Sequence, residues 1–444
     1  WSEQDPADWI AATRVALADL REQPGNAYRA VEGIGLSGHM HGATMLGDDG
    51  EVLRPCMLWN DTRSQVQAAH MDANTAFRMV SGNIVFPGFT APKVAWVRDN
   101  EPEVFAKLAK VLLPKDYLRF RLTGTYVSEM SDAAGTSWLD VEKRCWSKEL
   151  LAATGLTSDQ MPILVEGTQV SGKVSAEIAA ELGLSSDGVV AGGAGDNAAS
   201  AIGMGCVEHG DAFLSLGTSG VLFAVNDRYS PNAESGVHAF CHAQPETWHQ
   251  MGVILSATDA MNWLSGLTGK SPSDLDAALS RDLDDPSDIT FLPYLSGERT
   301  PHNDAAIRGA FIGLSHASSA AQMTKAVMEG VAFAFADCRD ALAAAGTTIT
   351  RATAVGGGAK SRYWLELMAT VLDIELDVPA DGEFGAAFGA ARLGLIAATG
   401  ATSASVCTKP SIEQTIKPNP QKADAYKIAL HRYRALYPAL KNLG

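Results

Sequence analysis

The amino-acid sequence predicts an α/β fold made of two successive domains, each with a mixed sheet flanked by helices. For most of the 444 residues, segments with apolar residues at helical spacing alternate with short runs rich in β-branched residues. The same rhythm starts again at Asp211, after a glycine-rich stretch. Hydrophobic residues make up 46% of the chain and charged residues 19%, which is typical of folded proteins and excludes extended disorder. We therefore expect one domain over residues 1–206 and another over 207–444.

In the first half, helix and strand signals follow one another in order. Trp9, Ala16 and Leu20 lie at helical spacing within a helix predicted over residues 7–22. Asp and Gly accept the positive φ of tight turns, so Gly47-Asp48-Asp49-Gly50, between two apolar pairs, predicts a hairpin. The remaining predicted elements are strands over 31–36 and 188–191 and helices over 92–98, 115–122 and 175–182.

The second half contains a hairpin and a long helix. Two apolar runs, 213–216 and 221–225, are joined by Gly217-Thr218-Ser219-Gly220 and predict the hairpin. An alanine-rich helix is expected over 320–345. A strand over 353–355 then runs into Gly356-Gly357-Gly358, and an amphipathic helix begins at Ser361.

Charge and cysteine usage limit the classes of partner. Lys and Arg total 35 against 51 Asp and Glu, a net charge of −16, so we expect neither nucleic acid nor a membrane as a partner. The six cysteines lie far apart with no C-x-x-C pair, which indicates reduced thiols and a cytoplasmic protein. No run approaches the ~18 apolar residues of a membrane span, and the start at Trp1 lacks a signal-peptide pattern.

Asp196 follows an apolar strand and a turn that contains Gly192, Gly193 and Gly195. One interpretation is that Asp196 caps the following helix. The second is a functional carboxylate, because three glycines in one turn let a ligand approach the backbone closely. The spacing does not give the G-x-G-x-x-G pattern with a later acidic residue, so a dinucleotide site is weakly supported.

Two further glycine-containing turns are candidate phosphate or nucleotide sites. At the hairpin tip, the backbone N–H groups and hydroxyls of Gly217, Thr218 and Ser219 can converge on phosphate oxygens. An ordinary polar turn explains the same residues. Gly357, Gly358 and Ala359 lie between a strand and a helix, where bare backbone could accept a ring or a phosphate. A tight turn with Ser361 as helix cap explains this stretch equally well.

The remaining motifs have competing interpretations. His39 and His41 could ligate a metal, but no third ligand with suitable spacing is visible; alternatively, Met40 and His41 face a sugar. Gly269-Lys270-Ser271 resembles the end of a P-loop but lacks the earlier glycine, so we interpret it as a chance match. Gly297-Glu298-Arg299-Thr300-Pro301 is interpreted as a loop held by its own ion pair, with Arg299 as a cleft residue the less favoured alternative. The absence of G-x-S-x-G argues against a serine esterase.

Taken in order, these stretches resemble the FGGY carbohydrate kinases, and most closely the xylulose kinase branch of that family. The resemblance covers nearly the whole chain. The stretches that carry it are Trp1–Pro6, Ser37–Gly42, Leu58–Asp61, Pro87–Lys93, Leu113–Arg119, Gly195–Asn197, Ser215–Gly220, Gly297–Pro301 and Gly356–Gly358. It implies two actin-like (ribonuclease H-like) domains with a ligand cleft between them, the sugar held by the first and ATP by the second. It also implies phosphorylation of D-xylulose at the 5-hydroxyl with ATP and Mg²⁺.

The resemblance also implies roles for single residues. Asp196 matches the general base and is assigned to Mg²⁺ as well. Sugar contacts are implied for Met40, His41 and Asn197. Residues implied at the phosphates or near the nucleotide are Gly217, Thr218, Ser219, Gly357, Gly358 and Ala359. Base, backbone donors and metal together suffice for phosphoryl transfer.

The sequence departs from the family pattern in two places. His39 stands where the family usually has Gln, and the family's first strand and Asp-x-Gly-Thr-Ser loop are expected ahead of Trp1. With that segment, we expect a complete kinase; without it, a sugar-binding protein of the same fold. The motifs are also compatible with a kinase of another ketose or polyol, whereas the glycine spacing only weakly supports a nicotinamide dehydrogenase. A homodimer is compatible with these features, and the sequence does not decide the oligomeric state.

Overall fold

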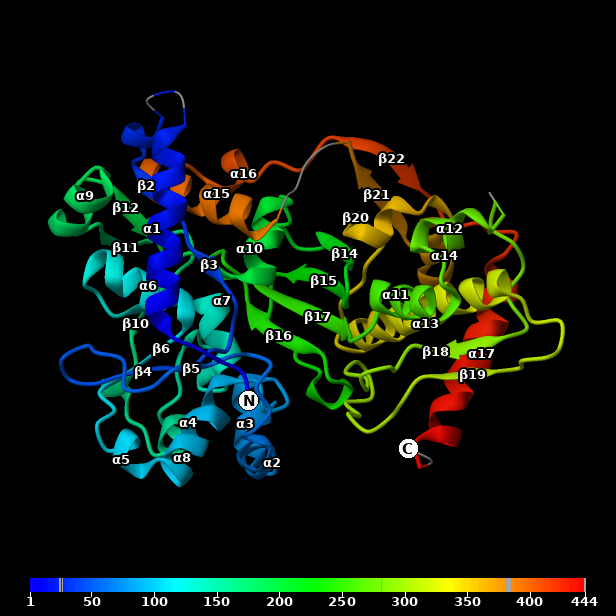
Figure 1. The fold of residues 1–444 in the computed structure, drawn as a ribbon, viewed down its shortest axis with the longest axis horizontal. Helices are drawn as coiled ribbons and strands as arrows, with labels where there is room; N and C mark the ends of the chain where they lie inside the picture. The colour runs from blue at the N-terminus through cyan, green and yellow to red at the C-terminus, as the bar shows by residue number, and fades with distance from the viewer. Residues whose placement is uncertain (24, 26, 281, 381–384, 443–444) are drawn as a thin grey trace.

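The computed structural model describes residues 1–23, 25, 27–280, 282–380 and 385–442. The first half of the chain alternates short strands and helices around several small sheets (Figure 1). Its helices are α1 (Pro6–Glu22), α2 (Gln65–Asp72), α3 (Thr75–Ser81), α4 (Thr90–Asn100), α5 (Pro102–Phe105), α6 (Pro114–Thr123), α7 (Met130–Ala133), α8 (Lys148–Ala153), α9 (Ala176–Leu182) and α10 (Asp196–Gly203). Its strands are β1 (Glu3–Gln4), β2 (Gly33–Ile34), β3 (Ser37–Gly38), β4 (Thr44–Leu46), β5 (Cys56–Met57), β6 (Lys110–Leu112), β7 (Val127–Glu129), β8 (Leu139–Asp140), β9 (Cys145–Trp146), β10 (Ile163–Val165), β11 (Val170–Lys173), β12 (Val189–Ala191) and β13 (Ala194–Gly195).

The predicted strand over 31–36 is divided into two short strands. β2 pairs in parallel with β12, and β3 pairs in parallel with β13. Gly193, with φ of 75°, turns the chain between β12 and β13. Because this turn separates β12 from β13, the stretch that pairs with them is also divided, into β2 and β3. The continuous apolar run over 31–36 does not reveal this division. The hairpin predicted at 47–50 is confirmed, because the Gly50 amide donates to the Gly47 carbonyl at 3.0 Å.

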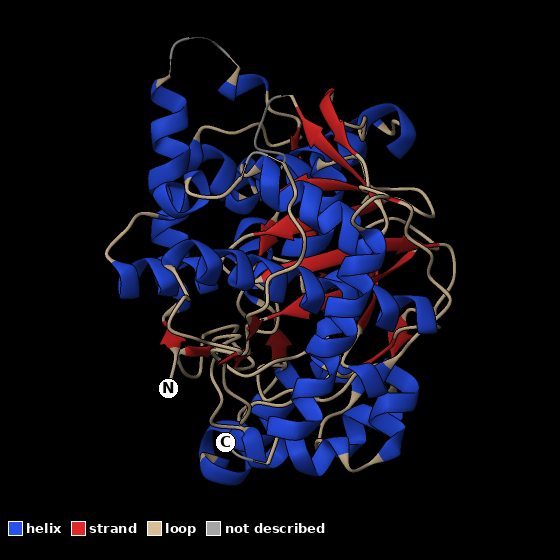
Figure 2. Ribbon diagram, turned by 90° about the vertical axis from the view of Figure 1, so that its right-hand side faces the viewer, coloured by secondary structure: helices blue, strands red, loops and turns tan. Residues whose placement is uncertain are grey.

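The second half is built on one seven-stranded sheet, with helices flanking the strands (Figure 2). The strand order is β16-β17-β15-β14-β20-β21-β22, and only β14–β20 and β20–β21 pair in parallel. The strands are β14 (Ala212–Leu216), β15 (Gly220–Asn226), β16 (His238–Cys241), β17 (Trp248–Ile254), β20 (Arg351–Val355), β21 (Glu375–Pro379) and β22 (Ile412–Ile416), with β18 (Thr290–Leu292) and β19 (Ala310–Ile312) in a separate pair. The helices are α11 (Thr258–Thr268), α12 (Pro272–Ala277), α13 (Ala320–Ala344), α14 (Arg362–Leu372), α15 (Ala386–Thr399), α16 (Ser403–Val406) and α17 (Ala423–Leu440).

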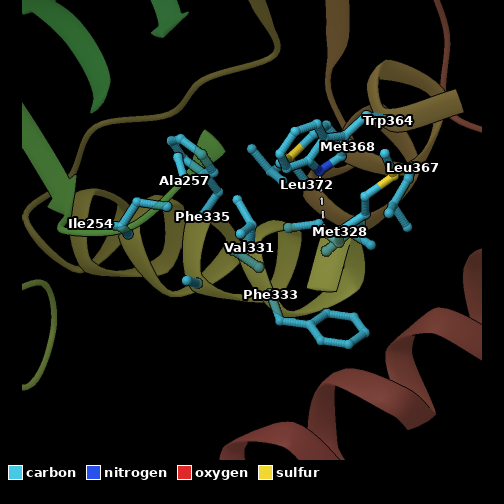
Figure 3. Close-up of a cluster of buried hydrophobic side chains, with 14 of the residues drawn as sticks. Ile254, Ala257, Met328, Val331, Phe333, Phe335, Trp364, Leu367, Met368 and Leu372 are labelled. Atoms are coloured by element: carbon cyan, nitrogen blue, oxygen red, sulfur yellow. Dashed lines mark hydrogen bonds between the residues drawn. The ribbon is translucent and has the colours of Figure 1, made fainter. Parts of the chain in front are cut away.

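The largest apolar core lies between this sheet and the helices α13 and α14. Figure 3 shows Met328, Phe335 and Trp364 among its buried side chains. The Trp364 indole N–H donates to the Met328 carbonyl at 3.1 Å and ties α14 to α13. α13 begins at Ala320 as predicted, and a capping box formed by Ser319 and Gln322 fixes this start.

α15, from the second half of the chain, lies on the first half. α15 packs against α10, β2 and β12, as its orange ribbon shows in Figure 1. The approach is so close that a Cβ on Gly389 would lie 1.7 Å from the Ala199 carbonyl oxygen. The predicted division at 206–207 falls between α10 and β14 and stays a prediction. Within the described ranges, each helix is too short or too polar to cross a membrane.

Candidate functional site

Asp196 is the first residue of α10, directly after β13. The N-cap of this helix is Gly195, so the interpretation of Asp196 as the cap is wrong. The Asp196 Oδ1 atom accepts from the Asn197 backbone N–H at 2.8 Å and from its side-chain amide at 3.2 Å. The Asp196 residue is exposed to solvent. The surrounding protein nevertheless desolvates the carboxyl group and raises its pKa above the ordinary value for Asp, although the Asn197 hydrogen bonds act in the opposite direction.

The predicted sugar-contacting pair lies beside this helix start. Met40 is buried, and a Cβ on Gly195 would lie 3.0 Å from the Met40 sulfur. The His41 Nδ1 atom is 2.7 Å from the Gly135 carbonyl oxygen. Because a carbonyl oxygen only accepts, Nδ1 carries the hydrogen and Nε2 is left as an acceptor. Burial lowers the pKa of His41 to about 3, so the ring is neutral at physiological pH.

The backbone of His41 has a left-handed conformation, with φ of 70°. Two side chains of α4 hold it: the Lys93 ammonium donates to the His41 carbonyl at 2.9 Å, and the Thr90 hydroxyl donates to the same oxygen at 3.2 Å. The His41 ring stacks on Phe89 with centroids 4.5 Å apart. The supporting residue Lys93 is not among the predicted site residues, and its only signal is its place in the stretch 87–93.

The interpretation of Arg299 as half of a local ion pair is wrong. Among the described residues, Glu298 makes no ion pair with Arg299; its carboxylate accepts from the Arg299 backbone N–H at 2.8 Å and from the Leu255 N–H at 3.1 Å. The guanidinium lies 4.2 Å from the ring centre of Phe86, and its Nη1 is 3.4 Å from His238 Nε2. Arg299 thus reaches Phe86 of the first half.

His238 and Arg299 add polar groups next to the Phe89–His41 stack. The ring centroid of His238 is 6.0 Å from that of Phe89, and burial lowers the pKa of His238 well below its ordinary value. Burial also lowers the pKa of Arg299 to about 10. Nothing in the sequence marks His238, a single histidine at the start of a strand.

The turn at 217–219 is fixed to the start of α11. The Thr258 N–H and hydroxyl donate to the Gly217 carbonyl at 2.9 and 2.8 Å, and the Ala257 N–H donates to the Thr218 carbonyl at 2.8 Å. Thr218 and Ser219 are exposed at the tip. The carbonyls of Gly217 and Thr218 are therefore occupied by the start of α11. The hydroxyls of Thr218 and Ser219 remain at the exposed tip, where they can donate to a ligand.

A pocket of about 430 Å³ lies next to this turn. Gly357 and Gly358 line it, whereas Ala359 is partly buried against the core instead. A Cβ on Gly358 would lie 2.9 Å from Leu216 Cβ, so the two glycine-containing turns are adjacent. The other lining residues come from α11 to α14 and the segments between them: Thr258, Met261, Asn262, Pro272, Ser273, Asp276, Met328, Lys360, Ser361 and Trp364. No sequence motif marks most of these.

The segment 269–271, which resembles part of a P-loop, joins two helices. Gly269 ends α11 in a left-handed conformation, and Ser271 caps α12. It has no phosphate-loop geometry. All six cysteine thiols are free.

α10 lies where the two halves of the chain meet. One buried cluster contains Ala201 of α10, Met204 directly after that helix, Met40 of the first half, and Phe213 and Phe223 of the seven-stranded sheet. The predicted base and sugar pair are therefore next to the interface, and the pocket lies on the second half. This is the arrangement expected for a two-substrate enzyme whose ligands meet between its domains.

Comparisons with known proteins agree with this arrangement. The model of the FGGY family of carbohydrate kinases, N-terminal domain, matches residues 1–203, and that of the C-terminal domain matches residues 212–398. The chain is 45% identical to the xylulose kinase of Escherichia coli strain K12, over 99% of this chain and 91% of that protein.

Solved structures give the same result. The crystal structure titled as a xyloylose kinase from Brucella ovis has a TM-score of 0.98 and 60% identity, over 100% of this chain and 92% of that one. The xylulose kinase from Rhodospirillum rubrum has a TM-score of 0.92 and 29% identity, over 100% and 91%. The two-domain actin-like fold expected from the sequence is confirmed, and the chain belongs to the FGGY family of carbohydrate kinases.

Proposed function

We propose that this protein transfers the γ-phosphoryl group of ATP to the 5-hydroxyl of D-xylulose. The observation that carries the proposal is the placement of Asp196, with its raised pKa, beside Met40 at the interface of two halves. The full-length similarity to proteins named xylulose kinase supports xylulose as the substrate.

In the first half, Asp196 acts as general base. It accepts the proton of the 5-hydroxyl while the oxygen attacks the γ-phosphorus and the bond to the ADP oxygen breaks. A raised pKa brings the carboxylate closer to the operating pH and makes it a better base. Asn197, beside it, offers an amide to a neighbouring sugar hydroxyl. His41, neutral and with Nε2 as acceptor, receives a hydrogen bond from another hydroxyl.

In the second half, the pocket receives the nucleoside and the adjacent turns receive the phosphates. Its volume of about 430 Å³ lies within the range of small-molecule sites. Gly357 and Gly358 leave bare backbone on its wall, with Ala359 packed behind them. Gly217, Thr218 and Ser219 then present N–H groups and hydroxyls to phosphate oxygens.

The residues present fit a Mg²⁺ ion that arrives with ATP. Among the residues that the structure describes, no three His, Cys, Asp or Glu side chains converge as a metal site. Mg²⁺ usually binds through one or two carboxylates together with substrate phosphates and waters, and Asp196 supplies such a carboxylate. When bound, the ion neutralises charge on the phosphates.

The substrate assignment is tested by the sugar dependence of ADP formation with the full-length protein. We expect turnover with D-xylulose to exceed that with glycerol or L-ribulose, and the product to be D-xylulose 5-phosphate by ³¹P NMR. A higher kcat/KM with another ketose or polyol would reassign the substrate. Xylulose binding without ADP formation would support a non-catalytic protein of this fold.

We further infer a cytoplasmic location from the six free thiols, which suit a reducing compartment. Assembly as a homodimer stays a prediction, as does the absence of nucleic-acid and membrane partners.

A further inference from the structure

A cluster of five ionisable side chains is buried beneath the loop that carries Asp196. Its members are Lys115, Asp116, Arg119, Glu129 and Asp132, and each charged side chain is 0% exposed. They come from α6, β7 and α7. Lys115, Asp116 and Arg119 lie in the stretch Leu113–Arg119, one of those that carry the family resemblance. None of the five side chains has a role in the proposed reaction.

Lys115 is the centre of this cluster. Its Nζ atom lies 2.8 Å from Asp116 Oδ1, 3.3 Å from Glu129 Oε1 and 3.2 Å from Asp132 Oδ2. Arg119 Nη1 is 2.7 Å from the same Asp116 oxygen. Burial and the two neighbouring carboxylates raise the pKa of Asp132 well above its ordinary value. With Asp132 protonated, two cations face two anions and the cluster is neutral.

The cluster is bonded to both ends of the segment 192–195, which consists of the turn at 192–193 and strand β13. At one end, the Arg119 guanidinium donates to the Gly192 carbonyl. At the other end, the Gly195 N–H donates to the Ser131 hydroxyl at 3.1 Å, and that hydroxyl donates to Glu129 Oε2 at 2.8 Å. Lys115 therefore forms an ion pair with Glu129, and two hydrogen bonds lead on from Glu129 through the Ser131 hydroxyl to the residue before Asp196.

We propose that Ser131 is a positioning residue for phosphoryl transfer, which fixes the Gly195 amide and with it the carboxylate of Asp196. The proposal rests on the proposed function, in which Asp196 is the base. Hydrogen bonds to ionised groups are about twice as strong as neutral ones, so Glu129 holds the hydroxyl firmly. A small displacement of a reacting group lowers the rate strongly, so a bond that holds the Gly195 amide helps to keep the adjacent Asp196 in place.

A purely structural role for Ser131 makes a different prediction. Glu129 also caps α7, accepting from the Ser131 and Asp132 backbone N–H groups. If the cluster only stabilised α7, loss of the Ser131 hydroxyl would lower stability and leave kcat and KM unchanged. If it positions Asp196, kcat falls while the KM for ATP, which binds the other half, stays the same.

The experiment compares Ser131→Ala with Ser131→Thr, which keeps a hydroxyl, and with Ser81→Ala as a matched control. Ser131 and Ser81 are both 1% exposed, but the Ser81 hydroxyl bonds only locally: it donates to the Phe77 carbonyl within α3 and accepts from the Asn83 backbone N–H at 3.4 Å. We expect Ser131→Ala to lower kcat by about 10- to 100-fold with an unchanged KM for ATP. We also expect faster hydrogen exchange at the Gly195 amide, recovery of kcat in Ser131→Thr, and no kinetic effect of Ser81→Ala.

A kcat of Ser131→Ala within twofold of the unmodified protein would overturn the proposal, whatever the exchange rate at Gly195. If Ser131→Ala does not fold, Ser131→Cys carries the test, because a thiol of similar size is only a weak acceptor and donor. An active Asp196→Asn variant would instead refute the assignment of the base, so the two failures are distinguishable.

Discussion

Replacing Asp196 by Asn removes the proposed base with little change to the fold. The Asn side-chain oxygen can accept the same two hydrogen bonds from Asn197, now at 2.8 and 3.2 Å, and Gly195 remains the N-cap. An amide cannot take a proton at neutral pH, and losing a general base typically lowers the rate by ~10²–10⁴-fold. This corresponds to about 2.7–5.4 kcal/mol of activation free energy.

The sign of the stability effect follows from the pKa of Asp196. The folded pKa is raised, so protonated Asp196 favours the folded state at low pH, and this contribution is lost as pH rises through the folded pKa. At neutral pH the ionised carboxylate therefore carries a net cost that Asn avoids. The Asn variant in turn loses the favourable interaction between the Asp196 charge and the dipole of α10, which is worth about a few tenths of a kcal/mol. We expect the Tm of Asp196→Asn to change by less than about 2 °C.

The assay follows xylulose-dependent ADP formation across pH. In the unmodified protein, kcat should fall as pH drops through the raised pKa of Asp196, because the base must be unprotonated. Asp187→Asn is the control: it makes the same charge change on a side chain that is 93% exposed. Near-normal turnover of Asp196→Asn would refute the reasoning and require another base.

Three further substitutions test other parts of the structure. His41→Asn, chosen because Asn tolerates positive φ, should raise the KM for xylulose about tenfold and leave the KM for ATP nearly unchanged. Equal increases in both KM values would refute the assignment of His41 to the sugar site. Thr218→Val should raise the KM for ATP about two- to tenfold, and an unchanged ATP dependence would remove the hydroxyl from the nucleotide site. Gly389→Ala should lower the unfolding free energy by about 1–3 kcal/mol in urea, because its Cβ meets the Ala199 carbonyl. Gly266→Ala in α11 is the control, because no atom lies within 4 Å of its Cβ, and it should not lower the unfolding free energy. Equal losses of unfolding free energy in the two Gly→Ala variants would contradict the packing argument.

The elements predicted best are those with local causes. The helix expected over 320–345 spans Ala320–Ala344, because its alanine-rich composition favours a helix and the capping box of Ser319 and Gln322 fixes its start. The hairpin around Gly217–Gly220 is also confirmed, since turn residues and apolar runs are neighbours in sequence.

The errors have non-local causes. The strand over 31–36 divides because its partners β12 and β13 are separated by a turn at Gly193. Lys115 and Arg119 resemble surface residues of an ordinary helix, and only the fold brings them to Glu129 and Asp132. The pocket could not be predicted for the same reason. Asn262 and Asp276 belong to helices that carry no motif, and they meet Gly358 only after α11, α12 and α14 are packed.

The position of α15 limits how the two halves can move. The chain passes between the halves at three places: between α10 and β14, between β21 and α15, and between α16 and β22. Two bodies joined by one linker can swivel freely, but three covalent connections remove most rotations. Arg392 of α15 donates to the carbonyls of Ile202 and Gly203 at the first connection and to that of Thr408 at the third, so these two lie close together. Any opening between the halves is therefore expected to bend about the region near Arg392, at the C-terminal end of α10, and to widen the gap most at points far from it.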